Sequence, residues 1–174
     1  MNINWKDSTL RFDPNSPDPF ATHGIPLPVY GNYGGPNWSA GQVGGIATNP
    51  PNPPPVDQLD TLFWAHDLAY QSSTDPLVRA AADILLVQQM HNLTYTDPGQ
   101  PNYDPEAGLY EGFSTLAILL QLAAGGVPPL PNQTLLVQDA ITNIEAGLAE
   151  VPGEAKSLHG AFHVFEHQYL DFLL

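Results

Sequence analysis

The sequence contains no cysteine in 174 residues. This absence excludes the small secreted domains that are held together by disulfide bonds. A chain of this length does not need such bonds, because a folded domain of about this size removes roughly 70% of its surface from water. We therefore expect residues 1–174 to form a single domain with an apolar core of its own.

Basic residues are also scarce. The 4 lysine and arginine residues are outnumbered by 18 aspartate and glutamate residues, which gives a formal net charge of −14 at pH 7. Proteins bind nucleic acids largely through lysine and arginine contacts to phosphates, so we expect no nucleic-acid partner. Carboxylates are instead common ligands of calcium, and the acidity of the chain favours a divalent cation as a partner.

Long apolar runs are missing as well. The longest, residues 116–120 followed by 122–124, is shorter than the roughly 20 residues of a transmembrane helix, so we expect no transmembrane segment. The first ten residues include Trp5, Lys6 and Asp7 and lack the basic and apolar regions of a secretory signal. Delivery outside the cell would then use a route other than an N-terminal signal in this chain.

Proline and glycine divide the chain into a loop region and a helical region. Of the 19 prolines, 11 lie in the first 55 residues together with several glycines. This composition predicts loops and extended structure for residues 1–55, with no persistent strand pattern. From Leu59 onward, apolar residues recur every three or four positions, as on one face of a helix. The sequence therefore predicts an all-α fold behind an N-terminal loop region.

The first two helices have clear start signals. One begins at Pro55 or Asp57, and the next begins where Asp75 precedes Pro76 and runs to about Leu93. Their short link predicts an antiparallel helix pair in residues 56–93. Residues 94–174 are expected to add accessory helices, in the ranges 105–124, 133–149 and 155–172, the first of them closed by two glycines.

Three short segments carry residue types that suit a cation-dependent reaction. They read Tyr-Gly-Asn-Tyr-Gly-Gly-Pro-Asn at 30–37, Pro-Val-Asp-Gln-Leu-Asp at 55–60 and His-Asp-Leu-Ala-Tyr at 66–70. A glycine-rich loop can turn its carbonyl oxygens inward, and Asp67 would add a carboxylate for a hard divalent ion. Neighbours on a helix point about 100° apart, so His66 and Asp67 must serve two tasks, which suits a base beside a metal.

Taken in this order, the segments resemble the secreted phospholipase A2 family. In that family a Tyr-Gly-rich calcium loop precedes a helix with Pro-Val-Asp-x-Leu-Asp and His-Asp-x-x-Tyr, and a second aspartate of the site lies on an adjacent antiparallel helix. The resemblance covers roughly residues 30–90. It implies a calcium-dependent phospholipase A2, a secreted carboxylic ester hydrolase that releases the sn-2 acyl chain of glycerophospholipids at a membrane surface or micelle.

The resemblance also implies a role for individual residues. His66 would activate the attacking water as a general base, with Asp83 as its orienting partner and Tyr70 supporting that aspartate. Asp83 follows three alanines, and an ionised carboxylate in such an apolar stretch needs a partner. The Ca²⁺ would be held by the carboxylate of Asp67 and by carbonyl oxygens of the calcium loop, from Tyr33, Gly35 and Asn37.

The chain departs from the family in several places. Asn37 stands where the family has glycine, although asparagine tolerates left-handed dihedral angles better than most residues. The five positions that are cysteine in animal members carry other residues, which resembles the disulfide-free viral and microbial branch. They are Asn32, Gly34, Leu62, Phe63 and Ala69. Residues 38–54 are longer than the corresponding family segment, and they would either shape the substrate entrance or decorate the surface.

Two other functions fit parts of the pattern. A metal-dependent phosphohydrolase of the HD type also uses an adjacent histidine and aspartate, but it needs a further histidine, such as His23 or His91, and a further aspartate. A non-catalytic calcium-dependent module that binds lipid or protein would keep the fold without turnover. Asp83 has an alternative as well, as a packing residue bonded to Tyr70 or Tyr95.

The remaining candidates have structural interpretations beside the functional ones. Asp57 and Asp60 are interpreted as helix-start charges rather than ligands. Three histidines recur every four residues near the C-terminus and would either gather a metal or pack on a helix face. Three aromatic residues would either form a membrane-facing rim or cap the core. The histidines are His159, His163 and His167, and the aromatic residues are Trp5, Phe20 and Trp38.

Overall fold

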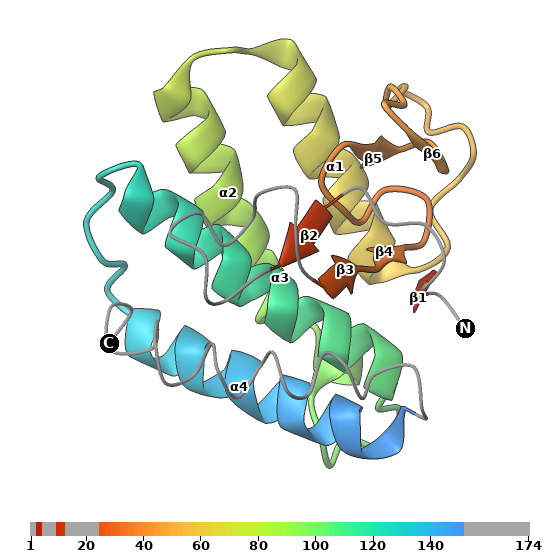
Figure 1. Ribbon diagram of the computed structural model, residues 1–174, viewed down its shortest axis with the longest axis vertical. Helices are drawn as coiled ribbons and strands as arrows, with labels where there is room; N and C mark the ends of the chain where they lie inside the picture. The colour runs from red at the N-terminus through yellow and green to blue at the C-terminus, as the bar shows by residue number, and fades with distance from the viewer. Residues whose placement is uncertain (1–2, 5–9, 13–24, 152–174) are drawn as a thin grey trace.

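Two pairs of helices make up most of the computed structural model, which describes residues 3–4, 10–12 and 25–151 (Figure 1). The first pair is α1 (Gln58–Ser72) and α2 (Pro76–Met90), and the second is α3 (Pro105–Ala124) and α4 (Gln133–Glu150). A short 3₁₀ helix, η1 (Thr94–Thr96), follows α2. The described residues are therefore mostly helical, as the sequence predicts. The expected helix at 155–172 lies outside them, as do Trp5, Phe20, His23 and the three C-terminal histidines.

Aspartate caps begin three of the helices. Asp57 accepts the main-chain N–H of Asp60 at the start of α1, Asp75 accepts that of Leu77 at α2, and Asp104 accepts those of the second and third residues of α3. Pro76 and Pro105 occupy first helical positions, where no N–H is needed. The predicted starts of these helices are therefore confirmed.

Helix α2 ends three residues before the predicted Leu93. The side-chain amide of Asn92 donates to the carbonyl of Gln88 at 2.7 Å, and Leu93 has extended dihedral angles. A side chain thus takes the place of the next main-chain hydrogen bond, which ends the helix. The antiparallel arrangement of α1 and α2 is as predicted (Figure 1).

Helices α3 and α4 approach each other closely at two glycines. A Cβ atom on Gly112 would lie 2.5 Å from the carbonyl oxygen of Ala140, and one on Gly147 would lie 2.6 Å from the Cβ of Leu109. No larger side chain fits at either position without separating the helices. Helix α3 is also the one helix of the described residues that is long and apolar enough to cross a membrane, but most of it is buried inside this fold.

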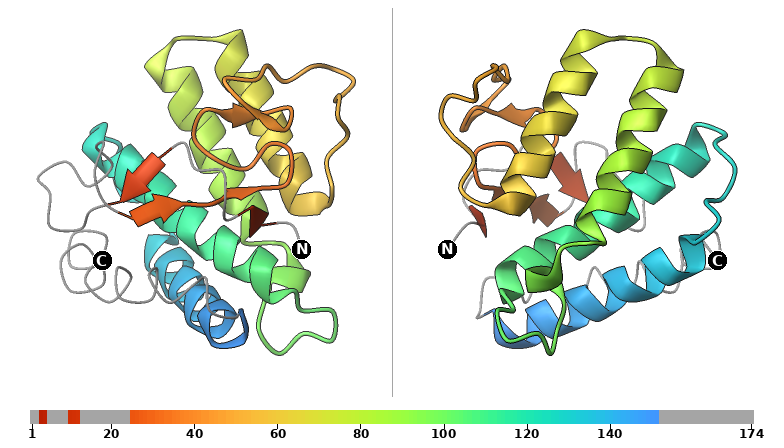
Figure 2. Two further views of the ribbon diagram at one scale, coloured as in Figure 1. Left: turned by 45° about the vertical axis from the view of Figure 1, so that its right-hand side comes forward. Right: turned by 180° about the vertical axis from the view of Figure 1, so that it is seen from behind.

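The loop region contains short strands, which the sequence interpretation missed. Antiparallel pairs form between β1 (Ile3–Asn4) and β4 (Val29–Tyr30), between β2 (Leu10–Phe12) and β3 (Ile25–Leu27), and between β5 (Trp38–Ser39) and β6 (Gln42–Val43). Figure 2 shows them together on one side of the helices. Strands of two or three residues are too short for an alternating apolar pattern to emerge.

Three aromatic rings join the loop region to the helices. Tyr30 from β4 lies 5.1 Å from Tyr110 of α3, and Phe63 of α1 lies 5.7 Å from Tyr110, measured between ring centroids. Tyr30 is fully buried. Trp38 is buried as well, and its indole N–H donates to the carbonyl of Gly31 at 3.2 Å. Of the two interpretations of Trp38, the structure therefore supports a place in the core.

Candidate active site and cation site

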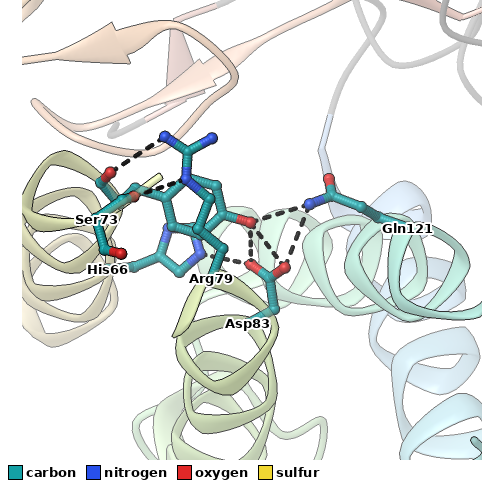
Figure 3. A network of polar contacts seen from close by, with 6 residues as sticks. His66, Ser73, Arg79, Asp83 and Gln121 are labelled. Carbon is teal, nitrogen blue, oxygen red and sulfur yellow. Dashed lines mark hydrogen bonds and ion pairs between the residues drawn. The ribbon is translucent and has the colours of Figure 1, made fainter. Parts of the chain in front are cut away.

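The structure brings His66 of α1 and Asp83 of α2 into direct contact (Figure 3). The Nε2 atom of His66 lies 2.7 Å from Oδ1 of Asp83, and the side chains are 18% and 4% exposed, respectively. The histidine is thus partly open to solvent while its partner is buried. The contact exists because α1 and α2 run antiparallel and turn these two positions toward each other.

Two further side chains donate hydrogen bonds to Asp83. The hydroxyl of Tyr70 lies 2.7 Å from both carboxylate oxygens, and Nε2 of Gln121 lies 3.2 Å from Oδ2. An ionised carboxylate only accepts hydrogen bonds, so Nε2 of His66 must also be a donor to it. The proton of the neutral imidazole is therefore on Nε2, which leaves a lone pair on Nδ1. This is the state that a general base requires.

Tyr70 is held in place from several sides. Its ring lies 4.3 Å from the ring of His66, and the guanidinium of Arg79 lies 5.0 Å from its centroid. Arg79 also donates to the main-chain carbonyls of Ser73 and Tyr70. Burial, followed by the hydrogen bond to Asp83, raises the pKa of Tyr70 to about 12. The hydroxyl therefore stays protonated and remains a donor to the carboxylate.

Gln121 is a site residue that the sequence interpretation missed. It lies on α3, and its Nε2 atom donates to the Tyr70 hydroxyl at 3.0 Å as well as to Asp83. The signal available in the sequence was a single polar residue in the apolar stretch 116–124. The structure also separates Asp83 from Tyr95, which instead accepts the main-chain N–H of Leu59.

Asp60 organises the glycine-rich loop. Its fully buried carboxylate accepts the main-chain N–H groups of Asn32, Tyr33 and Val56 at 2.8 to 3.1 Å. Burial raises the pKa of Asp60, while these three hydrogen bonds act in the opposite direction. Asp60 does lie in the first turn of α1, as the sequence interpretation has it, but most of its hydrogen-bond partners lie in the loop, which that interpretation missed. Asp57 does cap α1, and it also accepts the hydroxyl of Tyr30.

Gly31 lets this carboxylate approach the loop. A Cβ atom at position 31 would lie 2.4 Å from the carboxyl carbon of Asp60, and the residue has a φ of +52°. Both the space and the dihedral angle require glycine here. The loop conformation thus depends on the pair formed by Gly31 and Asp60.

Asp67 lies next to His66 on α1 but has a different environment. Burial raises the pKa of its carboxyl to about 6, although the neighbouring Ser39 hydroxyl and His66 act to lower it. Its Oδ2 atom is buried and has no hydrogen-bond partner among the described residues. Leaving such an oxygen unpaired costs about 1–3 kcal/mol, so a water molecule or an ion bound there would stabilise the fold.

The candidate loop ligands lie in the segment that Asp60 holds. The carbonyl of Gly35 accepts the N–H of Trp38 at 3.1 Å, and that of Asn37 accepts the N–H of Gly44 at 2.7 Å. Each carbonyl oxygen has a second lone pair, which remains free for an ion. Asn37 has a φ of +53°, so it adopts the left-handed conformation that asparagine tolerates better than most residues. Tyr33 is buried, and burial raises the pKa of its phenol, with smaller contributions from the charges of Asp60 and Asp67.

These donors fit calcium better than a transition metal. Carboxylate and carbonyl oxygens are hard ligands, which calcium prefers. The described residues contain no group of three or more histidine, cysteine, aspartate or glutamate side chains that could hold a metal. His91, one of the histidines considered for a phosphohydrolase site, is instead 3.1 Å from Asp139.

Comparison with known proteins adds no family assignment. No family model, no curated protein and no solved structure matches the chain. Any assignment of function therefore depends on the geometry of its own residues.

Proposed function

We propose that this chain is a calcium-dependent phospholipase A2 that hydrolyses the sn-2 ester of glycerophospholipids. The observation that carries the proposal is the contact of His66 with a buried Asp83 beside a second aspartate, Asp67, whose buried oxygen lacks a partner. The antiparallel α1 and α2 would then form the phospholipase A2-like helix pair. The substrate would lie in a membrane surface or micelle outside the cell.

His66 performs the proton transfers in this proposal. Its free Nδ1 atom accepts a proton from a water molecule as the water oxygen attacks the ester carbonyl carbon. When the tetrahedral intermediate collapses, the imidazolium returns the proton to the departing lysophospholipid oxygen, and the fatty acid is released. Asp83 stabilises the imidazolium and fixes the ring, and Tyr70 and Gln121 fix Asp83. No covalent acyl-enzyme forms.

The cation site would support this reaction next to His66. A calcium ion would be held by the carboxylate of Asp67 and by the carbonyl oxygens of Tyr33, Gly35 and Asn37. When bound, it would supply positive charge for the lipid phosphate and for the oxyanion of the transition state. Asp60 contributes by holding the N–H groups of the loop, so that the loop carbonyls keep their arrangement.

The release of fatty acid from an sn-2-labelled phosphatidylcholine tests the proposal. We expect activity with calcium, loss of activity with a chelator, and at least a hundredfold loss of kcat for His66→Ala. His91→Ala is the matched control and should keep full activity, because His91 pairs with Asp139 instead. Activity that survives the chelator or the loss of His66 would overturn the proposal. Calcium binding without turnover would favour a non-catalytic calcium-dependent module.

A further inference from the structure

The β5–β6 hairpin is fixed against the glycine-rich loop. Its turn residues Ala40 and Gly41 both have positive φ angles, of 52° and 72°, as in a tight two-residue hairpin. The N–H of Gly41 donates to the carbonyl of Asn32 at 2.8 Å, and Trp38 donates to Gly31 through its indole. Hydrogen bonds therefore anchor the hairpin to the glycine-rich loop.

Ser39 lies on the inner strand of this hairpin. The residue is 5% exposed, and a Cβ atom on Gly45 would lie 1.8 Å from its carbonyl oxygen, so the chain folds directly back over it. The Ser39 hydroxyl lies near the Asp67 carboxyl but forms no hydrogen bond of ordinary geometry with it. The hairpin thus carries a buried hydroxyl to the same place where α1 carries a buried carboxylate.

Both groups have oxygens without hydrogen-bond partners. Among the described residues, Oγ of Ser39 and Oδ2 of Asp67 are buried side-chain oxygens that form no hydrogen bond of ordinary geometry. A hydroxyl near a carboxylate can donate a hydrogen bond to it, but this hydroxyl does not, and a buried polar oxygen without a partner is unfavourable unless something binds it. A cation does so, because hard oxygen atoms of hydroxyl, carboxylate and carbonyl groups are the ligands that calcium collects, six to eight at a time.

We propose that Ser39 is a further ligand of the cation site and contributes its hydroxyl oxygen from β5. This inference depends on the calcium site of the proposed function. It adds to that site one ligand from the segment 38–54. Asp67 and the three loop carbonyls supply fewer oxygens than calcium takes, which leaves a position for Ser39. The hairpin is then part of the metal-binding structure.

Calcium titration calorimetry and thermal unfolding of the full chain test this role. We expect Ser39→Ala to weaken calcium binding about five- to twentyfold, while the melting temperature of the metal-free protein stays the same or rises, because an unpartnered hydroxyl is removed. Ser72→Ala is the matched control, since the Ser72 hydroxyl only donates to the main chain of α1. An unchanged calcium affinity of Ser39→Ala would overturn the proposal, whatever the melting temperature of the metal-free variant.

A second variant keeps the test decisive if Ser39→Ala folds poorly. Ser39→Cys has nearly the same volume but offers a soft sulfur in place of a hard oxygen. We expect it to bind calcium more weakly and cadmium more tightly than the natural protein, at least tenfold in the ratio of the two affinities. An unchanged ratio would contradict a ligand role.

The calorimetry also separates this proposal from the catalytic one. Absence of calcium binding to the natural chain would overturn both. Weaker binding by Ser39→Ala in a protein that shows no phospholipase activity would support Ser39 as a ligand and overturn only the enzyme.

Discussion

Gln121 of α3 donates a hydrogen bond to Asp83 of α2, with 3.2 Å between Nε2 and Oδ2. The same nitrogen lies 3.0 Å from the Tyr70 hydroxyl. One amide group therefore forms hydrogen bonds with both Asp83 and Tyr70, the two residues that contact His66. The geometry at His66 therefore depends on how α3 packs against the first helix pair.

Gln121→Leu should lower kcat without unfolding the protein. The change removes two hydrogen bonds from the Asp83 and Tyr70 pair, and because Gln121 is exposed we expect only a three- to tenfold loss of kcat and little change in melting temperature. Gln121→Glu should be worse at neutral pH, because it places a second negative charge beside Asp83. Steady-state kinetics on micellar phosphatidylcholine measure both effects.

Gln89→Leu serves as the control for this pair, since Gln89 is an exposed residue on α2. It should leave kcat unchanged. Full activity of Gln121→Leu would show that the amide of residue 121 does not position Asp83.

Asp60→Asn should disorganise the glycine-rich loop. One carboxylate oxygen becomes an NH₂ group that faces main-chain N–H donors, so a buried donor loses its acceptor. We expect a loss of about 2–4 kcal/mol in the free energy of unfolding and at least a tenfold loss of calcium affinity. Urea denaturation with a chelator and calcium titration measure the two effects separately.

Asp57→Asn is the matched control for the Asp60 variant. Asparagine caps a helix about as well as aspartate, so the loss of stability should stay well below that of Asp60→Asn. Similar losses for both variants would mean that Asp60 acts only at the start of α1.

The stability of the metal-free protein should depend on the charge of Asp67. Burial raises the pKa of this carboxyl from its usual 3.8 to about 6, so the folded state binds the proton more tightly than the unfolded chain does. The resulting stabilisation is complete below about pH 3.8 and is lost as the pH rises through about 6. Asp67→Asn should therefore be more stable than the natural chain by roughly 2–3 kcal/mol at pH 7.5, and about equal at pH 3.5.

Chemical denaturation at several pH values, with a chelator present, measures this difference. Added calcium should stabilise the natural chain at pH 7.5 and leave Asp67→Asn unaffected. Glu111→Gln is a useful comparison, because Glu111 is also buried with a raised pKa but has its hydrogen bonds with Thr115 and Asn143 rather than with the loop. That variant should keep the full calcium response, and a lost response would argue against Asp67 as the ligand.

The helices could be predicted well from the sequence because their signals are local. Asp75 and Pro76 indicate the start of α2 within two residues, and the two glycines after Ala124 indicate the end of α3. The β1–β4 and β2–β3 pairs could not be predicted, because they join residues far apart in the chain, such as Ile3 and Tyr30. Two residues of strand carry too little pattern to show such a pairing.

The candidate site likewise contains contacts that the sequence predicts and contacts that it does not. The contact between His66 and Asp83 follows from two helices joined by a short turn, which the sequence signals directly. The hydrogen bonds of Asp60 to the loop, and the place of Ser39 beside Asp67, depend on how the loop folds back on α1. Tertiary packing decides those relationships, and no short motif contains them.

Helix α3 contacts both the loop region and Asp83, and its length sets the spacing between these two contacts. Tyr110 packs on the aromatic rings of the loop region, and Gln121, eleven residues later, reaches Asp83. Eleven residues are about three helical turns, so both side chains leave the helix on the same side. A single inserted residue between them would rotate Gln121 by about 100° and remove it from Asp83. The number of residues between Tyr110 and Gln121 is therefore fixed by the two contacts that they make.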